Sequence, residues 1–141
     1  MKVLVDTSVW SLALRRSSPT AGGSQVLVRE LEDLIDDVRV VIIGPIRQEL
    51  LSGIPSPEQF AALREKLRAF DEVPLSLADH ELAAEFFNTC RSSGIQGSHT
   101  DFLICAVASS RGMAIFSSDG DFARYAQHLP VALHHPRDQV S

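Results

Sequence analysis

The chain has 141 residues, of which 45% are hydrophobic and 6% aromatic, and these proportions suit one ordinary globular domain with a substantial core. Its formal net charge of −5 excludes attraction of nucleic acid by the overall field, so a nucleic-acid partner would need a local basic patch. The sequence shows neither a signal-peptide pattern nor an apolar run near the roughly 18 residues that a membrane helix needs, and we expect a cytoplasmic protein.

The first half of the chain alternates strand and helix patterns. A short apolar run that ends at Asp6 predicts a strand, and the β-branched run that ends before Gly44 predicts a second, buried strand. Proline marks the start of a helix at Pro45 and again at Pro57. In chain order, the patterns predict a strand at 2–5, a helix from about residue 9, a loop at 15–24, a helix at 25–36, a strand at 38–43, and helices at 45–53 and 57–70.

The second half continues this alternation and closes the sheet. The patterns predict a strand at 73–75, helices at 78–92 and 100–110, a strand at 114–116, a turn at 117–120, a helix at 122–127 and a strand at 131–133. Because no hairpin signal joins the strands, we expect an α/β domain with right-handed crossovers, a mostly parallel central sheet and helices on both faces. Cys90 and Cys105 fall within apolar helical stretches and are expected to be buried free thiols.

Four acidic residues are predicted to meet at one edge of this sheet. Asp6 follows the first strand, and Asp119 lies in the turn after the fourth. Glu49 lies on the helix after the second strand, and Asp101 lies at the start of the helix at 100–110. Ligands bind at the carboxyl edge of open parallel sheets. Crowded carboxylates repel each other unless a divalent cation neutralises them, so the cluster predicts Mg²⁺ or Mn²⁺.

Each of these acids also has a purely structural explanation. Asp6 could cap the helix that follows it, and Ser98 with Asp101 could form a variant of the capping box. Asp119 belongs to a turn signal, and Glu49 could lie on a solvated helix face. Capping does not explain why small hydroxyl residues stand beside the acids that end the first and fourth strands. That combination suits an oxygen-rich site for a hard cation.

The acids lie in four blocks that resemble, in the same order, those of PIN-domain proteins of the VapC toxin type. The blocks are Val3-Leu4-Val5-Asp6-Thr7-Ser8-Val9-Trp10, Glu49-Leu50-Leu51 after Gly44-Pro45-Ile46, His99-Thr100-Asp101-Phe102-Leu103-Ile104-Cys105-Ala106, and Phe116-Ser117-Ser118-Asp119-Gly120-Asp121-Phe122. The family often has Thr where Ser117 stands, a change that keeps the hydroxyl. The resemblance implies a PIN-like three-layer domain over residues 1–136, followed by a tail at 137–141.

The resemblance also implies an activity, namely metal-dependent endoribonucleolytic hydrolysis of RNA by the toxin of a toxin-antitoxin pair. The residues implied to act in catalysis and to bind Mg²⁺ or Mn²⁺, directly or through water, are Asp6, Glu49, Asp101 and Asp119. Ser8, Ser117 and Asp121 are candidates to orient a carboxylate or a water on the metal. The implied partners are the RNA substrate, an antitoxin of the VapB type and a second copy of the chain in a homodimer.

Two kinds of surface would serve these partners. Trp10, Leu14 and the helix at 57–70 are candidates for an apolar groove that accepts a segment of the antitoxin, although core packing is the alternative for each. The basic residues that are candidates for phosphate contacts are Arg15, Arg16, Arg47, Arg91, Arg111 and Arg124. Ordinary solvated charge is the alternative for each of these arginines.

Three rival functions stay open on the sequence alone. A histidine-based ribonuclease is disfavoured because His134 and His135 form the one close histidine pair, and adjacent strand residues point to opposite faces if the strand continues there. A metal-dependent hydrolase of small phosphate esters is disfavoured because the first block lacks an Asp-x-Asp pair. A non-catalytic binding module of the same fold is disfavoured because an acid stands at every matching position.

Overall fold

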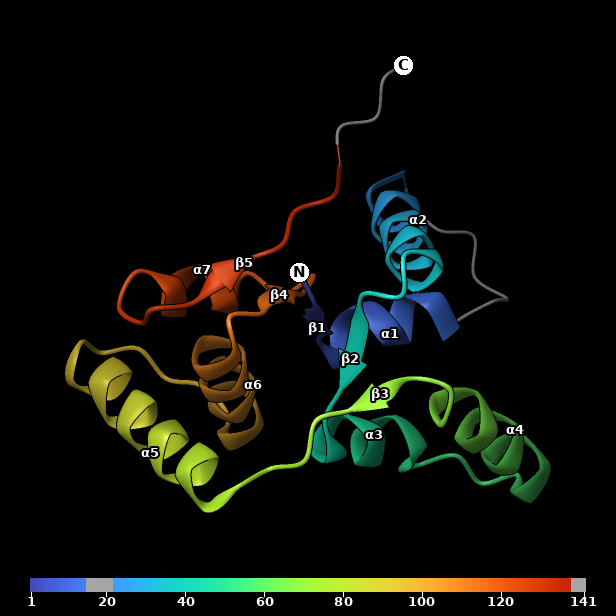
Figure 1. The fold of residues 1–141 in the computed structure, drawn as a ribbon, viewed down its shortest axis with the longest axis horizontal. Coiled ribbons are helices and arrows are strands. Elements are labelled where there is room, and N and C mark those ends of the chain that lie inside the picture. The colour runs from blue at the N-terminus through green and yellow to red at the C-terminus, as the bar shows by residue number, and fades with distance from the viewer. Residues whose placement is uncertain (15–21, 138–141) are drawn as a thin grey trace.

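The computed structural model describes residues 1–14 and 22–137, and its centre is a five-stranded sheet in the order β3-β2-β1-β4-β5 (Figure 1). All four strand pairings are parallel, which confirms the predicted α/β class. The strands are β1 (Val3–Val5), β2 (Val40–Ile42), β3 (Asp71–Glu72), β4 (Ala114–Phe116) and β5 (Ala132–Leu133).

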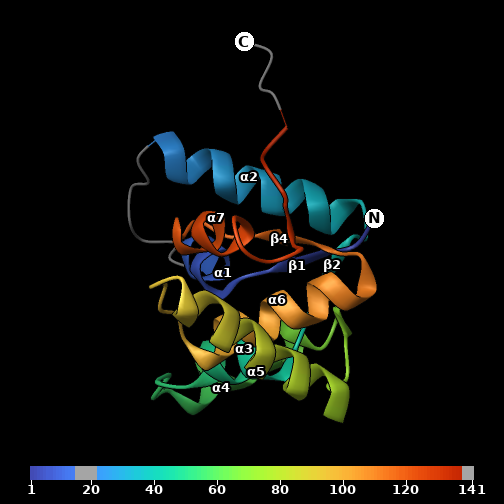
Figure 2. The ribbon, with the colours of Figure 1, turned by 90° about the vertical axis from the view of Figure 1, so that its left-hand side faces the viewer.

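Helices cover both faces of this sheet, with α2 on one side and α3 to α6 on the other (Figure 2). The helices are α1 (Thr7–Leu14), α2 (Gly22–Asp36), α3 (Gly44–Leu51), α4 (Pro57–Leu67), α5 (Leu77–Ser92), α6 (His99–Arg111) and α7 (Asp121–Ala126). Serine caps the start of α4, α5 and α6, where its hydroxyl accepts a backbone amide of the first turn. Gly112 ends α6 in the left-handed conformation that glycine adopts without strain.

The core is built around β1, whose three residues are completely buried between β2 and β4. A strand buried on both faces needs apolar residues throughout, as its Val-Leu-Val sequence provides. Cys90 and Cys105 are buried free thiols, as expected. Among the residues that the structure describes, no helix is long and apolar enough to cross a membrane.

The prediction of a strand at 73–75 was wrong by two residues, since β3 is formed by the exposed pair Asp71–Glu72. β3 is an edge strand, and backbone hydrogen bonds to β2 define it without any apolar side chain. The pairing extends as far as the amide of Val73, which donates to the carbonyl of Ile42 at 2.9 Å. The apolar pattern therefore marked the residues that pack after the strand and not the strand itself.

The helix predicted at 57–70 ends earlier, at Leu67, and Phe70 packs edge-on against Trp10 with ring centroids 5.1 Å apart. Helix α2 begins at Gly22, inside the segment predicted as a loop at 15–24. Two glycines at its start explain the difference, because glycine is a weak helix signal but is tolerated at the first positions. Residues 15–21 of that predicted loop lie outside the described part of the chain.

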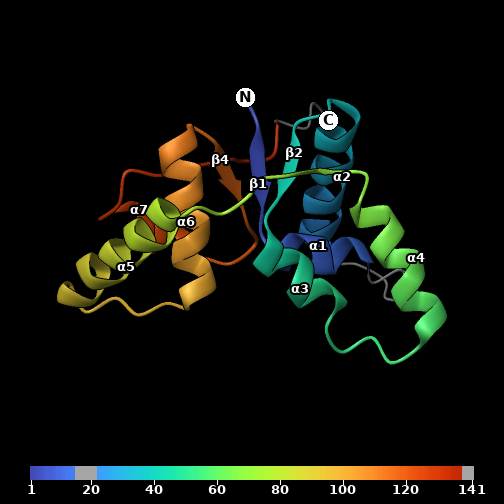
Figure 3. The same ribbon diagram turned by 60° about the horizontal axis from the view of Figure 1, so that its bottom comes forward.

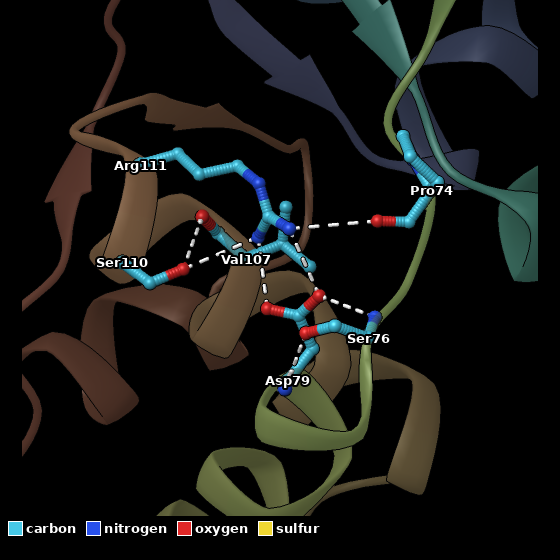
Figure 4. A network of polar contacts seen from close by, with 6 residues as sticks. All are labelled: Pro74, Ser76, Asp79, Val107, Ser110 and Arg111. Carbon is cyan, nitrogen blue, oxygen red and sulfur yellow. Dashed lines mark hydrogen bonds and ion pairs between the residues drawn. The ribbon is translucent and has the colours of Figure 1, made fainter.

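An ion pair joins α5 to the end of α6 (Figure 4). Arg111 donates to both carboxylate oxygens of Asp79, from Nη1 to Oδ1 at 2.8 Å and from Nη2 to Oδ2 at 2.9 Å. The backbone amide of Ser76 also donates to Asp79, which completes a capping box at the start of α5. Hydrogen bonds from Arg111 hold the pKa of Asp79 well below its usual range, although its burial acts the other way.

Replacement of this buried carboxylate tests the ion pair. We expect Asp79→Asn to lower the free energy of unfolding by about 2 kcal/mol at pH 7, because hydrogen bonds to a charged group are lost. The lowered pKa means that the stabilisation is complete above the ordinary pKa of about 4 and is lost as the pH falls below it. Urea unfolding of both proteins at pH 7 and pH 3 measures this difference, which should shrink at pH 3.

The exposed pair of Glu65 with Arg68 provides the control. Glu65→Gln should cost about 0.5 kcal/mol or less, because surface ion pairs contribute little. An effect of Asp79→Asn no larger than that of Glu65→Gln, or one that is the same at both pH values, would contradict the role of the buried pair.

Candidate active site

The parallel pairing of β1 with β4 sets the position of the site. Val5 is in register with Phe116, so the residues that follow, Asp6 and Ser117, leave the sheet side by side. The amide of Asp6 donates to the carbonyl of Phe116 at 2.8 Å, which extends this pairing by one residue. The carbonyl of Asp6 then accepts the first hydrogen bonds of α1. The strand end, the neighbouring strand and a helix start therefore all fix the backbone of Asp6.

Two serine hydroxyls hold the Asp6 side chain, which is only 8% exposed. Ser8 Oγ donates to Oδ2 of Asp6 at 2.7 Å, and Ser117 Oγ donates to the same oxygen at 2.9 Å. The amide of Ser8 also points to Oδ2, at 3.4 Å, so a weak capping contact accompanies the serine bonds. Neither serine hydroxyl contacts Oδ1 of Asp6.

Backbone amides fix the direction of both hydroxyls. Ser8 Oγ accepts from the amide of Ser118 at 3.0 Å, and Ser117 Oγ accepts from the amide of Asp119 at 3.0 Å. Each hydroxyl therefore accepts a hydrogen bond from a backbone amide and donates one to the Asp6 carboxylate. The role proposed from the sequence for Ser8 and Ser117, to orient a carboxylate or a water on the metal, stays a prediction.

Asp101 reaches the same place from α6. Burial raises the pKa of its carboxyl, and the negative charges of Asp6 and Asp119 raise it further. Hydrogen bonds from Tyr125 and Ser98 act in the opposite direction. The mutual repulsion means that the acids from β1, α6 and the end of β4 lie within electrostatic reach of one another.

The capping explanation for Asp101 accounts for its backbone and not for its carboxylate. Ser98 Oγ accepts from the amide of Asp101 at 3.0 Å, which is an ordinary helix cap. The Asp101 carboxylate has a further partner, since it accepts from the hydroxyl of Tyr125 at 2.6 Å. The sequence does not indicate this contact of Tyr125, because an aromatic residue at helical spacing is usually part of the core.

Asp119 is exposed and lines a cavity of about 190 Å³ together with Ser117 and Ser118. Its Oδ1 accepts from the backbone amide of Asp121 at 2.9 Å. The contact with Asp121 therefore runs through that residue's main chain, since the Asp121 carboxylate is paired with Arg124. Asp119 thus stabilises the turn through a backbone hydrogen bond and is also exposed at the edge of the sheet.

Glu49 lies apart from the other three acids. It is exposed on α3 and lines a different cavity, of about 640 Å³, with Ser11 and Lys66. Both helices cover the same face of the sheet, but in Figure 3 α6 lies to the left of β1 and α3 to its lower right. The fold therefore brings Asp6, Asp101 and Asp119 within electrostatic reach of one another and places Glu49 at a different cavity.

The donor atoms of this edge suit a hydrated magnesium ion. In the described part of the chain, no three side chains among His, Cys, Asp and Glu lie close enough to enclose a metal by themselves. Mg²⁺ keeps several of its waters and usually binds through one or two carboxylates, so it does not need such a cage. Asp6, with Oδ1 not used by the serines, and the repelling pair Asp101 and Asp119 supply oxygen ligands and negative charge of this kind.

Most of the arginines proposed for phosphate binding have protein partners. Arg47 pairs with Glu72, Arg111 pairs with Asp79, and Arg124 pairs with Asp121. Arg91 stacks over the ring of Phe87. Arg15 and Arg16 lie outside the described residues. The structure thus favours the structural explanation for Arg47, Arg111 and Arg124.

Two histidines, His134 and His135, lie near the site. β5 ends at Leu133, so strand alternation no longer applies to His134 and His135, and both line the cavity beside Asp119. His134 Nε2 lies 2.6 Å from Oε2 of Glu30, a residue of α2 that is 2% exposed. The local sequence does not indicate the burial of Glu30, because the C-terminal segment that covers it is distant in sequence.

Comparison with known proteins gives the family. The family model described as "PIN domain" matches residues 3–127, which is most of the chain. The chain belongs to the PIN-domain family. No curated protein matches this PIN domain significantly in sequence.

Solved structures match the PIN domain over nearly its whole length. FitAcB from Neisseria gonorrhoeae is 21% identical, with a TM-score of 0.74 over 97% of this chain and 99% of that one. VapBC2 from Rickettsia felis, bound to a DNA fragment from its promoter, is 16% identical, with a TM-score of 0.74 over 95% and 98%. VapBC-5 from Mycobacterium tuberculosis is 22% identical, with a TM-score of 0.66 over 94% and 98%. At these identities the likeness concerns the fold.

Removal of one serine hydroxyl tests how Asp6 is held. We expect Ser117→Ala to lower the free energy of unfolding by about 1–2 kcal/mol, because Asp6 loses a donor and the amide of Asp119 loses an acceptor. Ser117→Thr keeps the hydroxyl and should cost less. Urea unfolding measures both, with Ser92→Ala, which removes an exposed hydroxyl bond to Thr89, as the control. Equal losses in Ser117→Ala and Ser92→Ala would contradict this role.

Proposed function

We propose that this PIN domain is a Mg²⁺- or Mn²⁺-dependent endoribonuclease and the toxin of a VapBC-type toxin-antitoxin pair. The observation that carries the proposal is the convergence of Asp6, Asp101 and Asp119, from three separate elements, at the carboxyl edge of the sheet. Repelling carboxylates cost stability unless a cation neutralises them, which indicates a role other than folding. The family assignment supports the nuclease class, since PIN domains are generally nucleases.

Asp6, Asp101 and Asp119 are the residues that would hold the ion, directly or through water, whereas Glu49 lines a different cavity. When bound, a divalent ion supplies Lewis acidity and positive charge for phosphodiester hydrolysis. Ser8 and Ser117 fix Oδ2 of Asp6, so that Oδ1 keeps one orientation. In this mechanism water attacks the phosphorus, and the 2′-hydroxyl of RNA contributes to recognition and not to bond cleavage.

An apolar groove on the other side of the site suits the antitoxin partner. The similar structure from Mycobacterium tuberculosis is named as a member of the VapBC family of toxin-antitoxin systems. Here α1, α2 and α4 enclose a cavity of about 330 Å³, whose lining includes Trp10, Leu14, Val28, Ile35, Leu63 and Phe70. Leu14 and Leu63 also line the cavity that contains Glu49, so a bound segment could run from the apolar groove toward the acids.

Trp10 adds a polar anchor to this groove. Its Nε1 is buried and has no hydrogen-bond partner within the described residues. A buried donor without a partner is costly, and a carbonyl of a docked peptide would satisfy it. The homodimer that the family resemblance implies stays a prediction.

Asp6→Asn tests the catalytic proposal. The amide keeps the size of the side chain but removes its charge, so we expect RNA cleavage in the presence of Mn²⁺ to fall by about 100-fold or more. The assay incubates purified protein with structured RNA, single-stranded DNA and a small phosphate ester, with Mn²⁺ or with a chelator. Asp71→Asn, on the exposed edge strand β3, is the matched control and should cleave as the wild type does.

The outcomes separate the rival functions. RNA cleavage that requires both the metal and Asp6 supports the proposal. Turnover of the small ester without RNA cleavage would select the phosphohydrolase, and inertness toward all substrates would select the binding module. An RNA with a single 2′-deoxy nucleotide at the cut site adds a further test, since hydrolysis by water continues there and attack by the 2′-hydroxyl does not.

Leu14→Glu tests the groove. Leu14 is 37% exposed, so a charge there leaves the fold intact but opposes an apolar partner segment. When the chain is co-expressed with the protein of the adjacent reading frame, we expect the complex to be lost while RNA cleavage by the isolated chain is unchanged. Leu77→Glu, at a residue 77% exposed at the start of α5, should leave the complex intact. A complex that survives Leu14→Glu would contradict this docking site.

A further inference from the structure

Tyr125 is the chain's one tyrosine, and it is completely buried in α7. Its ring packs against Phe102 of α6 at 4.9 Å between centroids and against Phe122 at 5.3 Å. Two aromatic neighbours leave the ring little freedom to move. The hydroxyl at its end donates to Oδ2 of Asp101 at 2.6 Å, a short distance for a bond to a charged acceptor. The ring is therefore a rigid support that ends at one oxygen of a site carboxylate.

Gly97, in the loop before α6, makes room for this hydroxyl. A Cβ atom at that position would lie 2.2 Å from the Tyr125 hydroxyl oxygen and 2.7 Å from its ring carbon Cζ. Both distances are far inside van der Waals contact, so any larger residue would displace the tyrosine. The loop and α7 are thus matched to each other at the atom that contacts Asp101.

Burial holds the Tyr125 hydroxyl in its protonated form. Its pKa lies far above the usual value because burial and the nearby Asp101 carboxylate both disfavour a phenolate. The hydroxyl is therefore a hydrogen-bond donor throughout the physiological range. A permanent donor on Oδ2 fixes one oxygen of the Asp101 carboxylate, as the two serines fix Oδ2 of Asp6.

We propose that Tyr125, seated against Gly97, is a positioning residue that orients the Asp101 carboxylate toward the divalent cation. This inference rests on the proposed function and adds a residue outside the four acidic blocks. Donors that orient a ligand in this way raise metal affinity, and their removal costs about tenfold or more. The contribution of Tyr125 is therefore measurable as cation binding, independently of RNA cleavage.

The test measures the Mn²⁺ dissociation constant by electron paramagnetic resonance on the full chain. We expect Tyr125→Phe, which keeps the ring and removes the hydroxyl, to weaken Mn²⁺ binding by about tenfold. Asp79→Asn is the matched control, because it destabilises the fold at a distance from the sheet edge and should bind Mn²⁺ as the wild type does. A purely structural effect of Tyr125→Phe would leave Mn²⁺ affinity unchanged.

A double-mutant cycle tests the role of Gly97. Gly97→Ala displaces the hydroxyl and should weaken Mn²⁺ binding as much as Tyr125→Phe does. In the Tyr125→Phe background the same glycine substitution should weaken Mn²⁺ binding little further, because the hydroxyl that orients Asp101 is already absent, although the added Cβ still meets the ring carbon Cζ. Independent, additive effects would overturn the part of the inference that concerns Gly97.

The outcomes distinguish this inference from the function on which it rests. Wild-type affinity in Tyr125→Phe would overturn the positioning role and leave the nuclease proposal standing. Failure of the wild-type chain to bind Mn²⁺ would overturn both. Weakened binding in Tyr125→Phe with normal binding in Asp79→Asn supports both.

Discussion

The structure depends on the register between β1 and β4. Because Val5 lies opposite Phe116, Asp6 and Ser117 leave the sheet together, and the buried Asp6 carboxylate gains a hydroxyl donor that its own strand could not supply. A shift of one residue would turn Ser117 to the other face and leave a buried carboxylate without that donor. The apolar core on both sides of β1 fixes the register, so core packing and site geometry are set by the same contact.

The acids at this edge are placed where their negative charges disfavour one another. Asp101 sits where burial, Asp6 and Asp119 all disfavour its charge, and one phenol and one serine only partly oppose them. In contrast, the buried Asp79 elsewhere in the chain has a full set of donors from Arg111 and Ser76. Two buried or half-buried aspartates of one protein thus differ in whether their charge is satisfied within the chain. The unsatisfied one lies at the proposed metal site.

The sequence predicted the α/β class, the strands in the core and the convergence of Asp6 with Asp119, because buried strands carry an unbroken apolar signal. It misplaced β3, since backbone pairing alone defines that edge strand. It also missed Glu30 and Tyr125, whose partners lie 104 and 24 residues away in the sequence. Local patterns report which face of a helix is apolar, but they do not report which distant segment will cover a polar residue on it.

The segment after β5 holds α2 in place, which limits where the C-terminal end of the chain can be shortened or extended. Burial alone would raise the pKa of Glu30, but hydrogen bonds from His134 and Arg137 lower it on balance. Arg137 also pairs with Asp37, so this segment contacts the middle of α2 and the residue that directly follows the helix. A chain trimmed at Leu133 would lose both the segment that covers Glu30 and the contacts of His134 and Arg137 with its carboxylate. Affinity tags and fusion partners should therefore be attached after Arg137, so that the contacts of His134 and Arg137 with Glu30 and Asp37 are kept.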